Sequence, residues 1–245
     1  MKPLRPCVVL RVMLALTALV CFVRVPTVQA TRIAAVQQQR QQRSQQQQAQ
    51  QQSPSRKLFA PVDLGLLEAP DRDAWQKPDQ VMQALGIADG SVVGDLGAAS
   101  GWFTIRLARF VGPNGLVYAE DVQNPMIEAI ERRVKREGLS NVRTVLGDTR
   151  DPRLPAGELD AILIVETYHE MEDPVTLLRN AAKALKPQGR IGIIDYRKDG
   201  LGPGPSLEDR VDPETIVRDA NAAGLRLLKR ETFLPFQFFL VFGKR

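Results

Sequence analysis

Cysteine is nearly absent from this chain of 245 residues, and histidine occurs only once. Both cysteines, Cys7 and Cys21, lie in the first 30 residues, so residues 58–245 contain none. A folded part without cysteine has no disulfide, no thiolate nucleophile and no cysteine ligand for a metal. The sequence therefore predicts no metal site, and it excludes enzymes that form a covalent thioether with their substrate.

Acidic residues are missing from the first 57 positions, which carry nine Lys or Arg and neither Asp nor Glu. Residues 58–245 hold the other 24 basic residues and all 28 acidic ones, which gives them a charge of −4. The overall charge of +5 therefore belongs to the N-terminal tail. Because the remaining chain is mildly acidic and lacks a basic surface, we expect no nucleic acid partner.

Residues 1–30 have the pattern of a signal peptide or an N-terminal membrane anchor. A basic start precedes Val12–Val23, which is apolar except for Thr17, and Val28-Gln29-Ala30 offers small residues for cleavage. The run is shorter than the roughly 20 residues of a membrane span. Export with cleavage and attachment to a membrane both stay open. The abundance of Arg without acid also fits an organelle transit peptide.

Residues 31–57 are rich in glutamine, which fills 12 of the 16 positions from 37 to 52. Such a segment cannot form an apolar face, so we predict a disordered linker. Residues 58–245 have the length and the apolar content of one domain with a sizeable core.

Within this domain, short apolar runs alternate with amphipathic segments. Strands are predicted at 91–96, 116–120, 141–146, 159–165, 190–196, 226–234 and 237–242, and helices at 78–85, 102–110, 125–137, 173–185 and 213–223. This alternation predicts an open, mostly parallel α/β sheet with helices on both faces. The last two strands are joined too tightly for a crossover and must be antiparallel. Ligands of such sheets bind beyond the carboxyl ends of the strands.

The turn after the first strand is a candidate ligand site. It runs from Asp95 through Gly97 and Ala99 to Gly101, and a helix starts directly after it. A glycine turn followed by a helix N-terminus presents backbone N–H groups to a bound molecule. The glycines at 94, 97 and 101 do not match the GxGxxG spacing of dinucleotide-binding proteins. This mismatch weakens the alternative of a nicotinamide-dependent oxidoreductase.

Acidic residues follow the next two strands. Asp121 ends the second strand, where a carboxylate can accept both hydroxyls of a ribose. Asp148 and Thr149 form a polar turn after the third strand, where an acid can accept a hydrogen bond from the amino group of adenine. Acids after successive strands, around one glycine turn, indicate a ligand that contains adenosine.

Four stretches of the domain resemble class I S-adenosylmethionine-dependent methyltransferases. They are VVGDLGAASGWFTIRLA, GLVYAEDVQNPMIEAI, NVRTVLGDTRDPRLPAGELDAILIV and ALKPQGRIGIIDYR, and they follow the order of the family. The resemblance implies a Rossmann-like, seven-stranded sheet with S-adenosylmethionine as cofactor. It implies that Gly97–Gly101 holds the methionine part, Asp121 the ribose and Asp148 the adenine. The family usually has glycine where this chain has Ala99, and alanine there is strained by about 1 kcal/mol if φ is positive.

In this fold the tract after the fourth strand faces the transferable methyl group, which implies roles for Glu166, Tyr168 and His169. An imidazole titrates near pH 6.5 and suits removal of a proton from an acceptor hydroxyl or amine. The alternative for His169 is a helix cap. Tyr168 is a candidate to contact the acceptor or to act as a structural lid, and Glu166 to lie near the sulfonium. Arg197 is a candidate for an anionic acceptor, with a solvated surface position as the alternative.

The acceptor is predicted by exclusion. No Asn-Pro-Pro-Tyr-like tract follows the fourth strand, which argues against amino groups of DNA bases or of glutamine. The acidic domain disfavours RNA. A small molecule is the remaining acceptor. One further alternative is a catalytically weak or inactive module that binds S-adenosylmethionine, and the sequence predicts no oligomeric state.

Overall fold

A computed structural model describes residues 58–245, which lie within one compact unit, Ser55–Arg245. The predicted signal peptide or anchor (1–30) and the predicted linker (31–57) lie outside the described residues. Among residues 58–245, no helix has the length and apolar character to span a membrane. Two short helices that the sequence pattern did not predict come first, the 3-10 helix η1 (Pro61–Leu67) and α2 (Arg72–Gln76).

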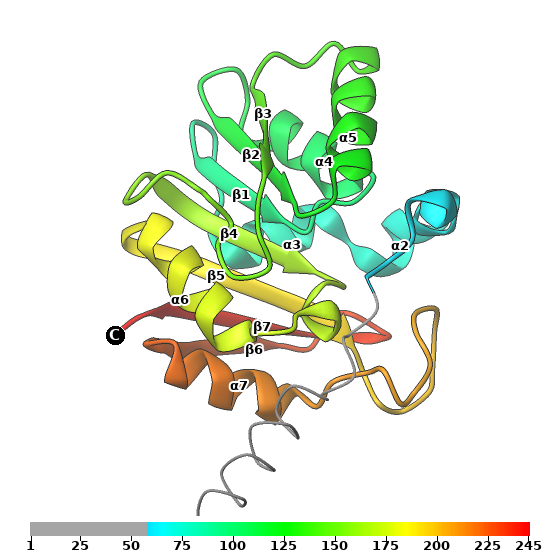
Figure 1. The fold of residues 1–245 in the computed structure, drawn as a ribbon, viewed down its shortest axis with the longest axis vertical. Coiled ribbons are helices and arrows are strands. Elements are labelled where there is room, and N and C mark those ends of the chain that lie inside the picture. The colour runs from blue at the N-terminus through cyan, green and yellow to red at the C-terminus, as the bar shows by residue number, and fades with distance from the viewer. Residues whose placement is uncertain (1–57) are drawn as a thin grey trace, which may run out of the picture. The chain divides into compact units, whose positions relative to one another are not determined.

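Seven strands form one sheet in the order β3-β2-β1-β4-β5-β7-β6 (Figure 1). The strands are β1 (Val92–Leu96), β2 (Leu116–Asp121), β3 (Val142–Leu146), β4 (Leu159–Val165), β5 (Leu185–Tyr196), β6 (Leu225–Glu231) and β7 (Gln237–Lys244). Neighbours from β3 to β5 are parallel, whereas β7 is antiparallel to both β5 and β6. The predicted mostly parallel sheet with a terminal antiparallel hairpin is therefore confirmed.

Helices cover both faces of the sheet (Figure 1). One face carries α3 (Pro78–Leu85), α4 (Trp102–Phe110) and α5 (Asn124–Arg136), and the other carries α6 (Pro174–Ala184) and α7 (Pro213–Ala222). Side chains alternate along a strand, so β7 contributes to both cores. Phe239 packs in the core under α3 and α4, and Phe242 packs in the core under α6 and α7.

The boundaries differ from the prediction mainly around β5. The sequence placed this strand at 190–196, yet it begins at Leu185, directly after α6. A register shift between Leu159 and Ala161 of β4 lets Leu185 pair with Leu159, so the Lys-Pro-Gln-Gly sequence continues the strand instead of forming a turn. Strand β6 ends at Glu231, three residues earlier than predicted.

Candidate functional site

A cavity of about 380 Å³ lies at the carboxyl ends of β1, β2, β4 and β5. This is where the sequence predicted a ligand. Seven predicted site residues line the cavity: Asp95, Gly97, Ala99, Asp121, Thr149, Glu166 and His169. Three others do not line it: Gly101, Asp148 and Tyr168.

The turn after β1 has a left-handed backbone conformation. The φ angle is 73° at Gly97, 48° at Ala99 and 76° at Gly101. The strain predicted at Ala99 is thereby confirmed, because a non-glycine residue at positive φ costs about 1 kcal/mol or more. At Gly97, an added Cβ would collide with the side chain of Thr167. At Gly101 the same Cβ would lie 3.5 Å from Ile130 Cγ1, an ordinary contact, so φ and not close packing explains that glycine.

Asp121 ends β2 with its carboxylate turned toward this glycine turn. Its Oδ2 accepts the N–H of Ala99 at 3.0 Å, and its Oδ1 accepts the N–H of Gln123 at 2.9 Å. Burial raises the pKa of Asp121, while the hydrogen bonds from Gln123 and Ala99 oppose that rise. Each carboxylate oxygen still has a lone pair for a ribose hydroxyl. Asp121 therefore both fixes the turn and presents acceptors to the cavity.

The turn after β3 contributes Thr149 and not Asp148 to the cavity wall. Asp148 is exposed, and its Oδ1 accepts the N–H of Arg150 at 3.1 Å. The Asp148 carboxylate therefore bonds to the backbone of its own loop. The adenine contact that the family resemblance implies for Asp148 stays a prediction.

Two further carboxyl groups are buried beneath the turn. Asp95 accepts the hydroxyl of Thr104 at 2.6 Å, and burial raises its pKa to about 6 despite that bond. Glu120 is 1% exposed; its Oε2 accepts the N–H of Gly97 at 3.3 Å, and its Oε1 has no hydrogen-bond partner. Burial, together with the charge of Asp121, raises the pKa of Glu120 to about 8. Glu120 is therefore mostly protonated at neutral pH, and no sequence pattern pointed to it.

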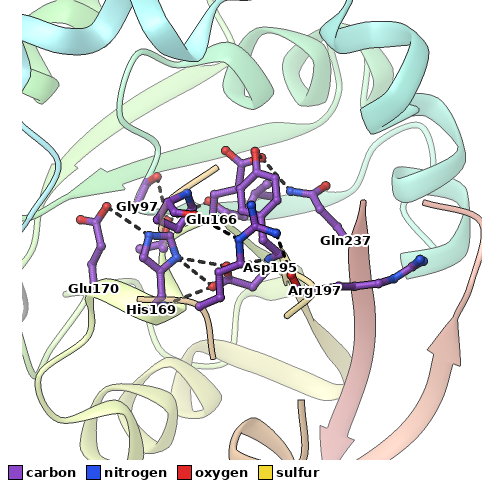
Figure 2. A network of polar contacts seen from close by, with 12 residues as sticks. Gly97, Glu166, His169, Glu170, Asp195, Arg197 and Gln237 are labelled. Atoms are coloured by element: carbon purple, nitrogen blue, oxygen red, sulfur yellow. Dashed lines mark hydrogen bonds and ion pairs between the residues drawn. The ribbon is translucent and has the colours of Figure 1, made fainter. Parts of the chain in front are cut away.

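Glu166 lies just beyond β4 with a φ of 55°, an unfavourable conformation for a residue other than glycine. Its Oε1 accepts hydrogen bonds from Tyr196 (2.8 Å), Gln237 (2.7 Å) and Gln76 (3.2 Å), and Arg72 lies 3.5 Å from its Oε2. Figure 2 shows Gln237 reaching Glu166 from β7. These partners hold the strained residue in place. Glu166 lines the cavity as predicted, but most of its acceptor capacity serves this network.

His169 pairs with Asp195, which is fully buried at the end of β5 (Figure 2). The ring Nδ1 lies 3.1 Å from both carboxylate oxygens, and Nε2 lies 3.8 Å from Glu170 Oε1. Burial lowers the pKa of His169, but the hydrogen bond and charge of Asp195, with Glu170 and Glu166, outweigh it and raise that pKa. Since Nδ1 is committed to Asp195, Nε2 is the nitrogen available to a bound molecule.

Tyr168 and Arg197, for which the sequence left both a ligand contact and another position open, do not line the cavity. Tyr168 is 1% exposed, and its hydroxyl donates to Asp219 Oδ2 of α7 at 2.6 Å, so it has the structural role. Arg197 donates to the carbonyls of Leu234 and Pro235 at 2.5 and 3.2 Å. Its guanidinium therefore joins the end of β5 to the loop before β7 and is not placed to bind an anionic acceptor.

The N-terminal part of the described chain adds a cation that no sequence pattern indicated. Arg72 of α2 is the only Lys or Arg of residues 58–245 that lines the cavity. Its Nη1 donates to Leu67 O and its Nε to Gln76 Oε1, both at 2.6 Å. The guanidinium carbon lies 4.4 Å from the ring centre of Trp102, the first residue of α4. Arg72 is thus placed beside the glycine turn.

Leu58 and Phe59, here called the N-terminal strap, also line the cavity. The N–H of Phe59 donates to Glu170 Oε2 at 2.9 Å, and its carbonyl accepts Gln123 Nε2 at 3.0 Å. Glu170 neighbours His169, whereas Gln123 neighbours Asp121. The strap therefore bridges the glycine-turn side of the cavity and the histidine side.

Comparison with known proteins shows which family this chain resembles. Residues 93–189 match the family described as "Methyltransferase domain". A crystal structure of a SAM dependent methyltransferase from Aquifex aeolicus is 28% identical, with a TM-score of 0.72, over 76% of this chain and 98% of that one. These matches support a class I S-adenosylmethionine-dependent methyltransferase.

Two curated relatives of this chain are named for particular substrates. Nocamycin O-methyltransferase from Saccharothrix syringae is 33% identical over 50% of this chain and 47% of that protein. Demethylmenaquinone methyltransferase from Geobacillus stearothermophilus is 30% identical over 47% of this chain and 48% of that protein. The chain thus spans about half the length of the curated relatives it matches. The family match gives no support to the nicotinamide alternative.

The residues present fit the family's cofactor, S-adenosylmethionine. Gly97 lets the turn pack against Thr167 at the cavity wall, and Asp121 offers acceptors to the hydroxyls of a ribose. Arg72 provides a cation for a carboxylate, and Glu166 provides negative charge for a sulfonium. The lining therefore offers partners for a carboxylate, for a ribose and for a positive charge, the groups that S-adenosylmethionine carries.

Proposed function

We propose that this chain transfers a methyl group from S-adenosylmethionine to a small-molecule acceptor whose attacking atom loses a proton to His169. The observation that carries the proposal is that His169, paired with buried Asp195, lines the same cavity as the glycine turn and Asp121. The names of the curated relatives, which refer to nocamycin and demethylmenaquinone, support a small molecule as acceptor.

In this proposal the residues of β1 and β2 hold the cofactor. Asp121 would bind the ribose hydroxyls, the Gly97–Gly101 turn the methionine part, and Arg72 the carboxylate. The bound cofactor supplies a methyl group that its sulfonium already activates. The main task of the chain is then to hold the acceptor atom in line with that methyl group, about 3 Å away, where water is excluded. The strap and the buried side chains around the cavity would limit the access of water to the bound molecules.

His169 would serve as the general base. Its Nε2 accepts the proton of the acceptor, and the carboxylate of Asp195 stabilises the resulting imidazolium through Nδ1. Solvent later takes up this proton. Asp195 is a positioning residue in this scheme, because it orients the ring and does not touch the acceptor.

Calorimetry with the full chain tests the cofactor site. We expect the wild type to bind S-adenosylmethionine and its demethylated product. Asp121→Ala should bind at least about tenfold more weakly, because hydrogen bonds to a charged group contribute about 1.5–3 kcal/mol each. Asp79→Ala removes an exposed carboxylate outside the cavity and is the matched control. Absence of binding by the wild type, or equal affinities for all three proteins, would contradict the proposal.

A cofactor-binding module without catalysis remains the second candidate, and the strained Ala99 is the observation that favours it. The fold is not decisive here, because the solved [4+2]-cyclase SpnF shares it with a TM-score of 0.59 at 19% identity. Cofactor binding without turnover over a broad panel of hydroxyl and amine acceptors would favour this candidate. Transfer to any of them would exclude it.

We also propose that residues 1–30 export the domain or attach it to a membrane, with an organelle transit peptide as the alternative. The basic start, the apolar run and the small residues at 28–30 support this proposal. Sequencing the mature N-terminus and testing which side of the membrane a protease reaches will distinguish the three cases. An intact N-terminus on a protein that stays in the soluble cytoplasmic fraction would contradict all of them.

A further inference from the structure

A second part of the cavity wall comes from residues that the cofactor does not require. Trp75 of α2, Tyr196 at the end of β5 and the segment Pro203–Pro205 all line it. Tyr196 is 4% exposed, and its ring centre lies 6.5 Å from that of Trp75. The two ring planes are tilted by 43° to each other, and together with the prolines they form an angled, apolar surface, which favours an aromatic ligand of low polarity. We refer to Trp75, Tyr196 and Pro203–Pro205 as the aromatic wall.

The aromatic wall is fixed in shape before any ligand binds. A Cβ on Gly204 would lie 2.6 Å from Tyr196 Cδ2, so the backbone of Gly204 packs directly against the tyrosine ring. Arg210 is 5% exposed and donates to the carbonyls of Arg197, Pro203 and Pro205 at 2.7, 3.2 and 3.1 Å. Its guanidinium carbon also lies 5.2 Å from the Tyr196 ring centre. This buried cation is used entirely in holding the segment.

The charges around the cavity disfavour an anion. The lining includes six carboxyl groups; Glu120 is mostly protonated, and the other five are Asp95, Asp121, Glu166, Glu170 and Glu172. Arg72, the only Lys or Arg of residues 58–245 in the lining, is already bound to Leu67, Gln76 and Glu166, and the proposed function uses it for the cofactor. A carboxylate or phosphate on the acceptor would lose its water without gaining a cationic partner, beside like charges.

The position of the base favours an acidic hydroxyl over an amine. His169 presents Nε2 to the cavity because Nδ1 faces Asp195. A neutral aromatic amine has a free lone pair and attacks without prior loss of a proton, so it would leave this pair unused. A phenol needs the base and matches the wall.

We propose that the acceptor is an uncharged phenol, without carboxylate or phosphate, that lies against the aromatic wall with its hydroxyl at His169 Nε2. This inference rests on the proposed methyl transfer. The hydroxyl proton passes to Nε2, and an oxygen lone pair forms the new O–CH₃ bond as the S–CH₃ bond breaks. The electron pair of the broken bond stays on sulfur, so the products are a methyl ether, a neutral thioether and an imidazolium that releases its proton to solvent.

Three phenols with short para substituents that are neutral, anionic or cationic test the inference: 4-ethylphenol, 4-hydroxyphenylacetate and tyramine. With the full chain, transfer of labelled methyl from S-adenosylmethionine gives kcat/KM for each, and mass spectrometry locates the methyl group. We expect 4-ethylphenol to be methylated on oxygen, with kcat/KM at least about tenfold above that of 4-hydroxyphenylacetate. Equal or higher values for 4-hydroxyphenylacetate, N-methylation of tyramine in preference to O-methylation, or no transfer to 4-ethylphenol would each overturn the inference.

A charge-reversal variant tests whether the charge of the cavity lining, and not the overall charge of the molecule, sets the preference for a neutral phenol. Glu172 is exposed and lines the cavity, so Glu172→Lys should raise the kcat/KM ratio of 4-hydroxyphenylacetate to 4-ethylphenol about tenfold. Glu158→Lys makes the same charge change at an exposed position outside the cavity and should leave the ratio unchanged. An equal shift in both variants would contradict the inference. Calorimetry on the same samples measures binding of S-adenosylmethionine. If the phenols fail while S-adenosylmethionine still binds, only the phenol inference is wrong. If S-adenosylmethionine does not bind, the proposed function itself is wrong.

Discussion

Replacing Asp195 with Asn tests the proposed base at nearly constant volume. The carboxylate of Asp195 accepts three hydrogen bonds in addition to carrying a charge. Its Oδ2 accepts the N–H of His169 at 3.2 Å, its Oδ1 accepts the N–H of Tyr196 at 2.8 Å, and both oxygens lie 3.1 Å from His169 Nδ1. An amide has only one oxygen, so in Asp195→Asn one of the two backbone N–H groups must face an NH₂ group.

The size of the effect follows from this geometry. A buried donor left without a partner costs about 1–3 kcal/mol, and the free energy of unfolding should fall by about that amount. A unit charge 3.1 Å from Nδ1 stabilises the imidazolium by about 5 kcal/mol at an effective dielectric constant near 20, before desolvation is subtracted. Without that charge the general base loses most of its effect, which is worth about 10²–10⁴-fold in kcat. The pKa of His169 should fall, so the acidic limb of the pH–rate profile should move to lower pH.

The assay measures kcat, the pH–rate profile and calorimetric affinity for the demethylated cofactor. We expect Asp195→Asn to lower kcat while the affinity stays within about twofold. In a His169→Asn background the same change should lower kcat no further, since the two residues act as a unit. A comparable loss of kcat in that background, or an acidic limb at an unchanged pH, would refute the reasoning.

Three other predictions concern the turn and the residues around it. The pKa of Glu120 in the folded protein is about 8, above its ordinary value of 4.5, so the folded protein binds more protons than the unfolded one between these two pH values. The free energy of unfolding of the wild type therefore falls as the pH rises from 4.5 to 8, by about 5 kcal/mol in total. Glu120→Gln should remove this fall in urea unfolding at a series of pH values; parallel curves for the two proteins would contradict it. Ala99→Gly should keep or raise the melting temperature, because glycine relieves the strain of the positive φ angle. Ala99→Val should lower the melting temperature, and an unchanged melting temperature for this variant would argue against the strain. Arg72→Gln should weaken binding of the demethylated cofactor about tenfold in calorimetry. The affinity for 5′-methylthioadenosine, which lacks the carboxylate, should change by less than about twofold. Equal losses of affinity for both molecules would contradict a contact between Arg72 and the carboxylate.

The parts of the fold and site that could be predicted are those encoded locally. The apolar run that forms β4 is contiguous in sequence, and the glycine turn and Asp121 lie next to their strands. The sequence could not show which of two adjacent residues in a short helix points into the core and which lines the cavity. In η2 (Tyr168–Glu170) the Tyr168 side chain enters the core against α7, while His169, one residue later, lines the cavity.

The partners of Glu166 show why the remaining site residues escaped prediction. Gln76 lies 90 positions before Glu166 and Gln237 lies 71 positions after it, and neither belongs to a recognisable motif. Only the packing of α2 and β7 against the end of β4 brings their amides to one carboxylate. The same holds for Glu120, whose burial depends on Gly147, because a Cβ there would collide with the Glu120 carboxyl group.

The dependence of Glu166 on Gln237 has a consequence for the order in which the protein is made. Gln237 begins the last strand, and that strand is also inserted between β5 and β6. During synthesis on the ribosome, the stretch that carries the family match, residues 93–189, is complete well before this strand leaves the exit tunnel. The nascent chain can therefore form the cofactor turn early, whereas Glu166 receives the hydrogen bond of Gln237 only after β7 has been made.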